Sequence, residues 1–186
     1  MMKKRGVSPV IATVLILLLT VAAVALLAGF VIPFVKKELP KSSECLNYRD
    51  YFNFQEVFTI QGQEYRYNCH QNGKYGISIK AVGTDDKLAE NVAGFSLAFV
   101  ENGSSERVDV LSGQDANSSE GGIRMLNSST SKIAVPEQSG VNTYVYNSGK
   151  SFYSVEVYPK LKSGRICERG DAITFIDCGS NINLSI

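Results

Sequence analysis

Thirty consecutive residues near the start of the chain, 6–35, include no charged side chain. Leu, Val, Ile and Ala predominate on every face of the helix that this run predicts, whereas a surface helix of a soluble protein keeps a polar stripe. The hydrocarbon core of a membrane is about 30 Å thick, and a helix of about 20 apolar residues spans it. The run therefore predicts an α-helix that lies in a membrane or in an equally dry protein environment.

The rest of the chain has a different pattern. Short runs rich in Val, Ile, Phe, Tyr and Thr are separated by clusters of Gly, Asn, Ser and Asp, as in proteins built from strands and turns. Apolar side chains alternate with small ones at Phe95, Leu97 and Phe99. We predict ten strands, at residues 56–60, 64–68, 75–82, 94–101, 107–111, 123–126, 132–135, 142–146, 152–158 and 172–176. This pattern predicts an all-β soluble domain, a β-sandwich whose topology, immunoglobulin-like or other, the spacing leaves open.

Three kinds of membrane segment begin with basic residues followed by an apolar run. A secretory signal peptide has an apolar stretch of about 7–15 residues and then a small-residue cleavage site; this run is longer and no such site follows it. A signal anchor keeps its basic residues in the cytoplasm, but Lys36 and Lys37 on the opposite flank weaken that charge bias. The third kind is cut in front of the apolar run, so the sequence between the basic residues and that run decides whether it applies.

The junction reads Lys3-Lys4-Arg5-Gly6 and then Val7-Ser8-Pro9-Val10-Ile11-Ala12. This string resembles the class III signal peptide and helix start of archaeal type IV pilins (the archaeal pilin N-terminal domain family). In that family a prepilin peptidase cuts on the cytoplasmic side, before the apolar helix, so the helix stays in the mature protein. The resemblance covers about 30 of the 186 residues. It implies a processing site formed by Lys3, Lys4, Arg5, Gly6 and Val7, with cleavage after Gly6.

The chemistry of the junction agrees with processing. Gly6 has no side chain to obstruct a peptidase, and Pro9 suits the first turn of a helix because that turn does not use its N–H. Bacterial type IV pilins usually carry Glu at the fifth mature position, where this chain has Ile11. That departure points away from the bacterial branch and leaves open how neighbouring subunits keep their register.

Two features of the apolar run bear on packing and length. Ala25 and Gly29 form a small-xxx-small pair, which lets helix backbones approach closely in apolar surroundings; Ala is also simply common in membrane helices, so both interpretations stay open. Pro33 is expected to kink or end the helix. The expected organisation is a signal peptide at 1–6, a membrane or filament-core helix at 7–37, a linker at 38–41 and an extracellular domain at 42–186.

Charge is distributed unevenly between these parts. Of the 19 Lys and Arg six precede residue 42, and of the 18 Asp and Glu only Glu38 does, so residues 42–186 carry a net charge of −4. A nucleic-acid-binding domain shows clustered positive charge instead. We therefore expect no nucleic-acid partner.

Four cysteines, Cys45, Cys69, Cys167 and Cys178, all follow the apolar run. An even number of cysteines beyond a membrane segment is typical of disulfides in an oxidising compartment. Three connectivities are possible. The turn signal at Gly170 and Asp171 favours Cys167–Cys178, which leaves Cys45–Cys69. A four-thiolate zinc site is the alternative, although the chain lacks its usual C-x₂₋₄-C pairs.

Four Asn-x-Ser/Thr sequons, which are glycan acceptors in exposed loops of secreted proteins, lie at Asn102, Asn117, Asn127 and Asn183. The chain has no G-x-S-x-G, Walker A or H-E-x-x-H motif. Its single histidine, His70, lies in a turn-like segment and is expected to be an exposed loop residue. We therefore expect no enzyme activity, cofactor or metal site.

These features predict a structural subunit, major or minor, of an archaeal type IV pilus-like surface filament used for adhesion or cell contact. The resemblance implies four kinds of partner: other copies of the chain in a helical filament, the prepilin peptidase, the membrane platform and ATPase of pilus assembly, and the membrane before assembly. The alternative is a monomeric, membrane-anchored extracellular binding domain. An anchored secreted enzyme is a third alternative.

Overall fold

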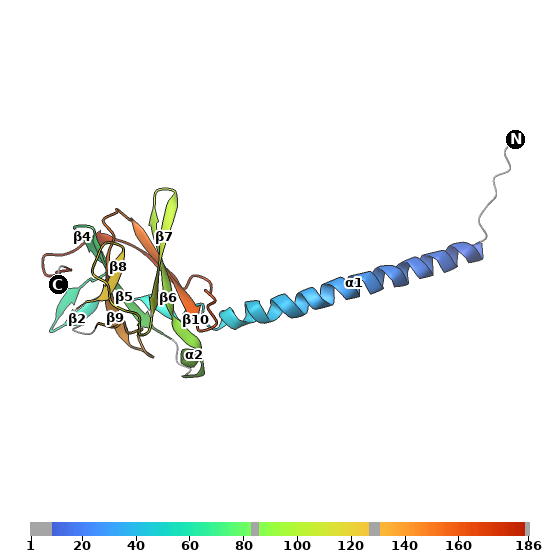
Figure 1. Cartoon of the computed structure of the whole chain (residues 1–186), viewed down its shortest axis with the longest axis horizontal. Helices are drawn as coiled ribbons and strands as arrows, with labels where there is room; N and C mark the ends of the chain where they lie inside the picture. Colours follow the sequence, from blue (N-terminus) through green and yellow to red (C-terminus); the bar gives the residue numbers. More distant parts are fainter. Residues whose placement is uncertain (1–8, 83–85, 127–130, 185–186) are drawn as a thin grey trace. The chain divides into compact units, whose positions relative to one another are not determined.

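A computed structural model describes residues 9–82, 86–126 and 131–184. The chain divides into two compact units, Met1–Glu44 and Cys45–Ile186. The described part of the first, residues 9–44, is helical, and the second is mostly β, as Figure 1 shows. The boundary lies three residues beyond the predicted start of the extracellular domain at residue 42. The structure therefore confirms a long apolar N-terminal helix followed by a β domain.

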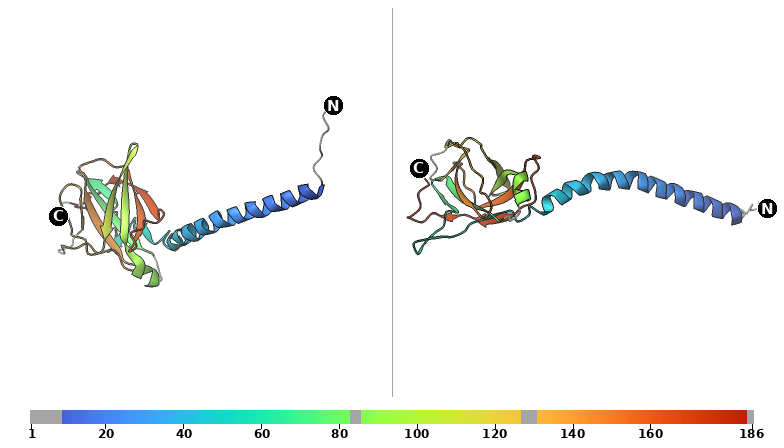
Figure 2. Two further views of the ribbon diagram at one scale, coloured as in Figure 1. Left: turned by 45° about the vertical axis from the view of Figure 1, so that its right-hand side comes forward. Right: turned by 90° about the horizontal axis from the view of Figure 1, so that it is seen from below.

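The helix α1 extends over Pro9–Leu46. It begins at Pro9, where the missing N–H costs no helical hydrogen bond. It does not end at Pro33, and the predicted linker at 38–41 is part of the helix. A proline inside a helix removes one hydrogen bond and favours a bend rather than a complete break. Accordingly, α1 curves along its length without interruption (Figure 2).

The larger sheet of the β domain has six strands, in the order β12-β4-β5-β9-β8, with β1 also paired to β5. These strands are β1 (Phe52–Phe54), β4 (Cys69–Gln71), β5 (Lys74–Ala81), β8 (Gly122–Met125), β9 (Val141–Asn147) and β12 (Ile176–Asp177). All pairs are antiparallel except β12 with β4, which is parallel. This parallel pair brings the C-terminal part of the chain beside an early strand.

The second sheet has four antiparallel strands in the order β11-β10-β6-β7. They are β6 (Val92–Glu101), β7 (Ser104–Leu111), β10 (Ser154–Leu161) and β11 (Asp171–Thr174). A separate hairpin pairs β2 (Phe58–Ile60) with β3 (Gln63–Tyr65), and a short helix α2 (Asp86–Asn91) precedes β6. The chain passes from the second sheet to the first between β11 and β12.

Side chains from both sheets form one hydrophobic core. Phe95 on β6 lies 5.5 Å, centroid to centroid, from the ring of Tyr144 on β9. Phe99 on the same strand lies 4.5 Å from the ring of Tyr146. All four side chains are fully buried. Aromatic pairs at these separations add about 0.5–1.5 kcal/mol each beyond the area that they bury, so they fix how the sheets pack together.

Small residues on the other face of β6 are buried as well. Ser96 and Ala98, which alternate with Phe95, Leu97 and Phe99 along the strand, are both almost fully buried. Longer side chains of neighbouring strands lie on this face: the guanidinium of Arg107 is 4.9 Å from the ring centroid of Tyr158, whose hydroxyl donates to Glu156 over 2.5 Å. Among the residues that the structure describes, the Ser96 hydroxyl is the one buried side-chain oxygen without a hydrogen-bond partner.

Nine of the ten predicted strands coincide with an observed strand. The tenth, at 132–135, is wrong, because this segment makes only an isolated bridge between Lys132 and Asp115. The pattern missed β1 and β4, which have three residues each, β12, which has two and follows β11 as a separate strand, and the short helix α2. Segments this short contain too few residues to show a periodicity.

Candidate functional site

The apolar surface of α1 is the most unusual feature of the chain. Val10–Val35 spans 26 residues with a mean hydropathy of 3.0, and none of it is buried within the chain. Its length and composition are enough to cross a membrane. The hydroxyls of Thr13 and Thr20 donate to the carbonyls of Val10 and Leu17, over 2.9 and 2.8 Å. The helix thus satisfies its own hydroxyl donors, as a segment in dry surroundings requires.

The small residues proposed for helix packing lie on this surface. Ala25 and Gly29 are both exposed, and a Cβ placed on Gly29 meets no atom of the chain within 4 Å. A neighbouring helix therefore has room to approach at this position. The packing role of Ala25 and Gly29 stays a prediction.

The predicted processing site, Lys3, Lys4, Arg5, Gly6 and Val7, lies outside the described residues. The first described residue, Pro9, already belongs to α1. Cleavage after Gly6 would thus leave the described part of the helix whole. The processing site itself stays a prediction.

The cysteines form two disulfides, but the favoured pairing is wrong. Cys45 is bonded to Cys167, and Cys69 is bonded to Cys178. The residues between Cys167 and Cys178 do not close a short hairpin, because they contribute β11 to one sheet and β12 to the other. The parallel pairing of β12 with β4 brings Cys178 to Cys69. No cysteine is free, which excludes the four-thiolate zinc site.

Both disulfides connect distant parts of the β domain. They join residues 122 and 109 positions apart, and loops of this length correspond to about 4–5 kcal/mol each in the chain-entropy model. Cys45 belongs to the last turn of α1, so its bond attaches the end of the helix to the segment that leads into β11. The two disulfides therefore add to the stability that the hydrophobic core gives the domain.

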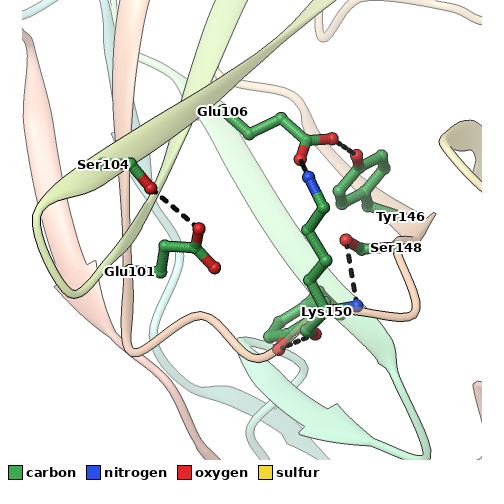
Figure 3. Close-up of polar contacts among 7 residues, drawn as sticks. Glu101, Ser104, Glu106, Tyr146, Ser148 and Lys150 are labelled. Carbon is green, nitrogen blue, oxygen red and sulfur yellow. Dashed lines mark hydrogen bonds and ion pairs between the residues drawn. The ribbon is translucent and has the colours of Figure 1, made fainter.

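Glu106, Tyr146 and Lys150 form a polar cluster between the two sheets (Figure 3). One carboxylate oxygen of Glu106 accepts a hydrogen bond from the buried Tyr146 hydroxyl, and the other lies 2.6 Å from the Lys150 ammonium. The bond from Lys150, and then that from Tyr146, lowers the pKa of Glu106. Burial, with the Glu106 bond, raises the pKa of Tyr146. Because both carboxylate oxygens are occupied, the cluster is suited to holding the sheets together rather than to catalysis.

His70 is not the exposed loop residue that the sequence predicted. It lies in β4 and is half-buried, with its Nε2 atom 3.1 Å from a carboxylate oxygen of Asp177 on β12. Among the described residues no group of three or more His, Cys, Asp and Glu is placed to hold a metal ion. This pair therefore contributes to the β4–β12 contact beside the Cys69–Cys178 bond.

The sequons fall in different surroundings. Asn102, in the β6–β7 turn, and Asn117 are exposed, and Asn183 is exposed between the buried residues Ile182 and Leu184. Asn127 lies outside the described residues. Asn117 accepts hydrogen bonds from both the backbone N–H and the hydroxyl of Ser119, over 2.9 and 2.7 Å. Its amide nitrogen makes no hydrogen bond within the described chain. Glycosylation at these sites stays a prediction.

An open pocket of about 530 Å³ lies beside β11, where the chain passes from one sheet to the other. Its lining comes from the segments around the β2–β3 hairpin, from the start of β10, and from β11 and β12. The side chains of interest are Glu56, Arg66, Asn68, Tyr153, Ser154 and Thr174. Sequence analysis pointed to none of them, because they are distant in sequence and follow no motif.

No protein-family model matches the chain, and a search of curated proteins finds no match. The likeness to archaeal type IV pilins therefore rests on the junction sequence and on the apolar helix behind it.

Proposed function

We propose that the chain is a structural subunit of an archaeal type IV pilus-like surface filament. The observation that carries this proposal is the apolar surface of α1, of which no part of Val10–Val35 is buried within the described chain, directly behind the sequence K-K-R-G-V. A prepilin peptidase cuts the precursor after Gly6. The precursor is a single-pass membrane protein with its β domain outside, and the assembled subunit is part of an extracellular filament.

Moving α1 from lipid into a bundle of identical helices exchanges one apolar environment for another. The exchange is nearly neutral per unit area, so close packing with many neighbours must favour the filament. The open space at Gly29 supports such an approach. Other copies of the chain are thus the main partners, and the assembly platform and ATPase extract the helix from the membrane.

The β domain is carried on the outside of the filament. Two sheets that share one hydrophobic core support the finer description of this domain as a β-sandwich. Glycans on its surface would protect the exposed domain. The acceptor sites in this proposal are Asn102, Asn117, Asn127 and Asn183.

Enlarging Gly29 tests the role of the helix. Leu is favourable in hydrocarbon, so Gly29→Leu should leave membrane insertion intact, whereas overpacking against neighbouring subunits costs about 1–3 kcal/mol per site. We expect less protein in sheared surface filaments and an unchanged amount in the membrane fraction of the same culture. Phe30→Leu, which adds no bulk at the next position, serves as the matched control. Equal filament yields for Gly29→Leu and wild type would contradict the packing role.

The second candidate function is a monomeric, membrane-anchored binding domain. The observation that favours it is the open pocket beside β11, since a filament subunit does not require one. This candidate predicts no sheared filaments even from the wild-type protein. The filament experiment therefore separates the two functions.

A further inference from the structure

The pocket beside β11 has the size and lining of a ligand site. Its volume of about 530 Å³ lies within the roughly 300–1,000 Å³ typical of pockets that bind small molecules. It is formed entirely by the β domain, and the filament proposal gives it no role. Its lining has an apolar part and a polar part, and together they define the chemistry of the ligand.

The apolar part consists of large side chains that the domain leaves accessible. Tyr153, just before β10, is 55% exposed, and Ile176 on β12 is 47% exposed. The other large aromatic side chains described in the β domain are buried or half-buried. An exposed ring beside a pocket offers a flat apolar surface with a polar hydroxyl at its end.

The polar part contains groups that the chain leaves unused. Within the part of the chain that the structure describes, the Glu56 carboxylate and the Ser154 and Thr174 hydroxyls make no hydrogen bond. The Arg66 guanidinium has only a distant partner, Glu64, at 3.9 Å. Donors and acceptors are therefore both available to a ligand, in the varied mixture that a polyhydroxylated molecule can use.

The walls of the pocket are held in place by the fold. The Asn68 amide donates to the Gln55 carbonyl over 3.0 Å and accepts from the Ser78 N–H over 2.7 Å. Ser154 and Thr174 are directly paired across β10 and β11. A pre-formed site of this kind binds its ligand without a large ordering cost.

From this lining we propose that the pocket binds a neutral saccharide. A sugar ring has apolar C–H faces that fit the Tyr153 ring, and hydroxyls that hydrogen-bond to the carboxylate, the guanidinium and the protein hydroxyls. Glu56 and Arg66 balance in charge, so a polyanion gains no net attraction. An acyl chain would bury the same polar groups without partners, which costs free energy. The proposal goes beyond the filament function and does not depend on it.

The test is a titration of the full chain in micelles of a detergent without a sugar headgroup, followed by NMR of the Tyr and Ile side chains. The probes are methyl glycosides of glucose, galactose, mannose and N-acetylglucosamine with disaccharides built from them; glucuronic acid and glucose 6-phosphate are the charged comparison. We expect saturable shifts at Tyr153 and Ile176 with at least one neutral probe. The charged probes should bind more weakly.

Variants assign the response to the pocket. Tyr153→Ala should weaken binding by about tenfold or more, as expected for an anchoring aromatic residue, and Tyr153→Phe should retain most of it because the ring remains. Val82→Ala, at an exposed residue outside the lining, should bind like wild type. Unchanged core resonances exclude unfolding as the cause.

Other results would overturn the proposal. These are the absence of saturable shifts with every neutral probe at millimolar concentration, equal binding of the charged probes, or shifts from a short extended peptide at this pocket where no sugar gives any. A loss of saccharide binding leaves N-terminal processing and filament yield unaffected. The failure of this proposal is therefore distinguishable from failure of the filament proposal.

Discussion

The helix and the β domain use the same kinds of apolar residue in opposite ways. Phe30 on α1 is 79% exposed, whereas Phe99 on β6 is fully buried among the rings of Tyr75, Tyr146 and Phe152. The β domain supplies its own apolar environment and adds two disulfides to it. No part of Val10–Val35 is buried within the described chain, so the helix does not supply its own apolar environment. The two regions thus differ in whether the chain itself covers their apolar side chains.

Replacing a phenylalanine by alanine in each region should give the largest difference in stability between them. Phe99→Ala removes a fully buried ring and should lower the free energy of unfolding of the β domain by about 3–5 kcal/mol. Phe30→Ala should leave the unfolding of the β domain unchanged, because the Phe30 side chain is exposed. Chemical denaturation of both variants in micelles, followed by tyrosine fluorescence, measures the difference. Equal losses would mean that α1 contributes to the folding of the β domain.

The disulfides add a second difference between the two regions, because all four cysteines lie beyond the apolar residues Val10–Val35. Replacing Cys69 and Cys178 by Ser should lower its free energy of unfolding by about 2–5 kcal/mol and leave the helix content of α1 intact by circular dichroism. Peptide mapping without reduction should recover Cys45 joined to Cys167 and Cys69 joined to Cys178. Recovery of Cys167 joined to Cys178 would contradict the fold, because it is incompatible with the strand pairing of β12.

The smallest expected effect concerns the cluster between the sheets. The pKa of Glu106 is lowered in the folded state, so its ionised form stabilises the fold above the ordinary carboxyl pKa. That contribution is lost as the pH falls through the lowered value. Glu106→Gln keeps an acceptor for Tyr146 but removes the charge, so it should be slightly less stable near neutral pH and should approach wild type in acid. The measurement is the free energy of unfolding against pH.

Lys150→Met provides the matched variant, because it removes the other charge of the pair. It should reduce the same pH dependence, and the double variant should add little to either single change. A constant difference between Glu106→Gln and wild type at every pH would show that the charge does not matter. The helix has no charged side chain over Val10–Val35, so this sensitivity belongs to the β domain.

Periodicity and composition predicted the features that depend on many neighbouring residues. The uncharged, mostly apolar run 6–35 predicted the helix, and alternation at Phe95, Leu97 and Phe99 predicted the central strand β6. The end of α1 was missed, because Pro33 and the expected linker at 38–41, which contains Pro40, suggested a stop that the helix does not make. A proline in the sequence shows where a helical backbone hydrogen bond is lost, but it does not show whether the helix continues beyond it.

Features that depend on contacts between distant residues were not predicted. The pairing of Cys69 with Cys178 follows from a parallel strand pair, and local turn signals carry no information about it. Glu106 and Lys150 are 44 positions apart, and the pocket collects residues from four segments of the chain. No periodicity connects such groups, so the sequence alone could not predict the cluster or the pocket.

The N-terminus of the protein in sheared surface filaments is the decisive measurement for a filament subunit with a retained helix. Intact-mass analysis and N-terminal sequencing of wild-type protein should give a chain that begins at Val7 and still contains residues 9–46. Gly6→Trp should prevent this cleavage and remove the protein from the filament fraction. A mature protein that begins beyond Val35, or one that keeps Met1 in the native host, would contradict processing after Gly6 and the filament role of α1.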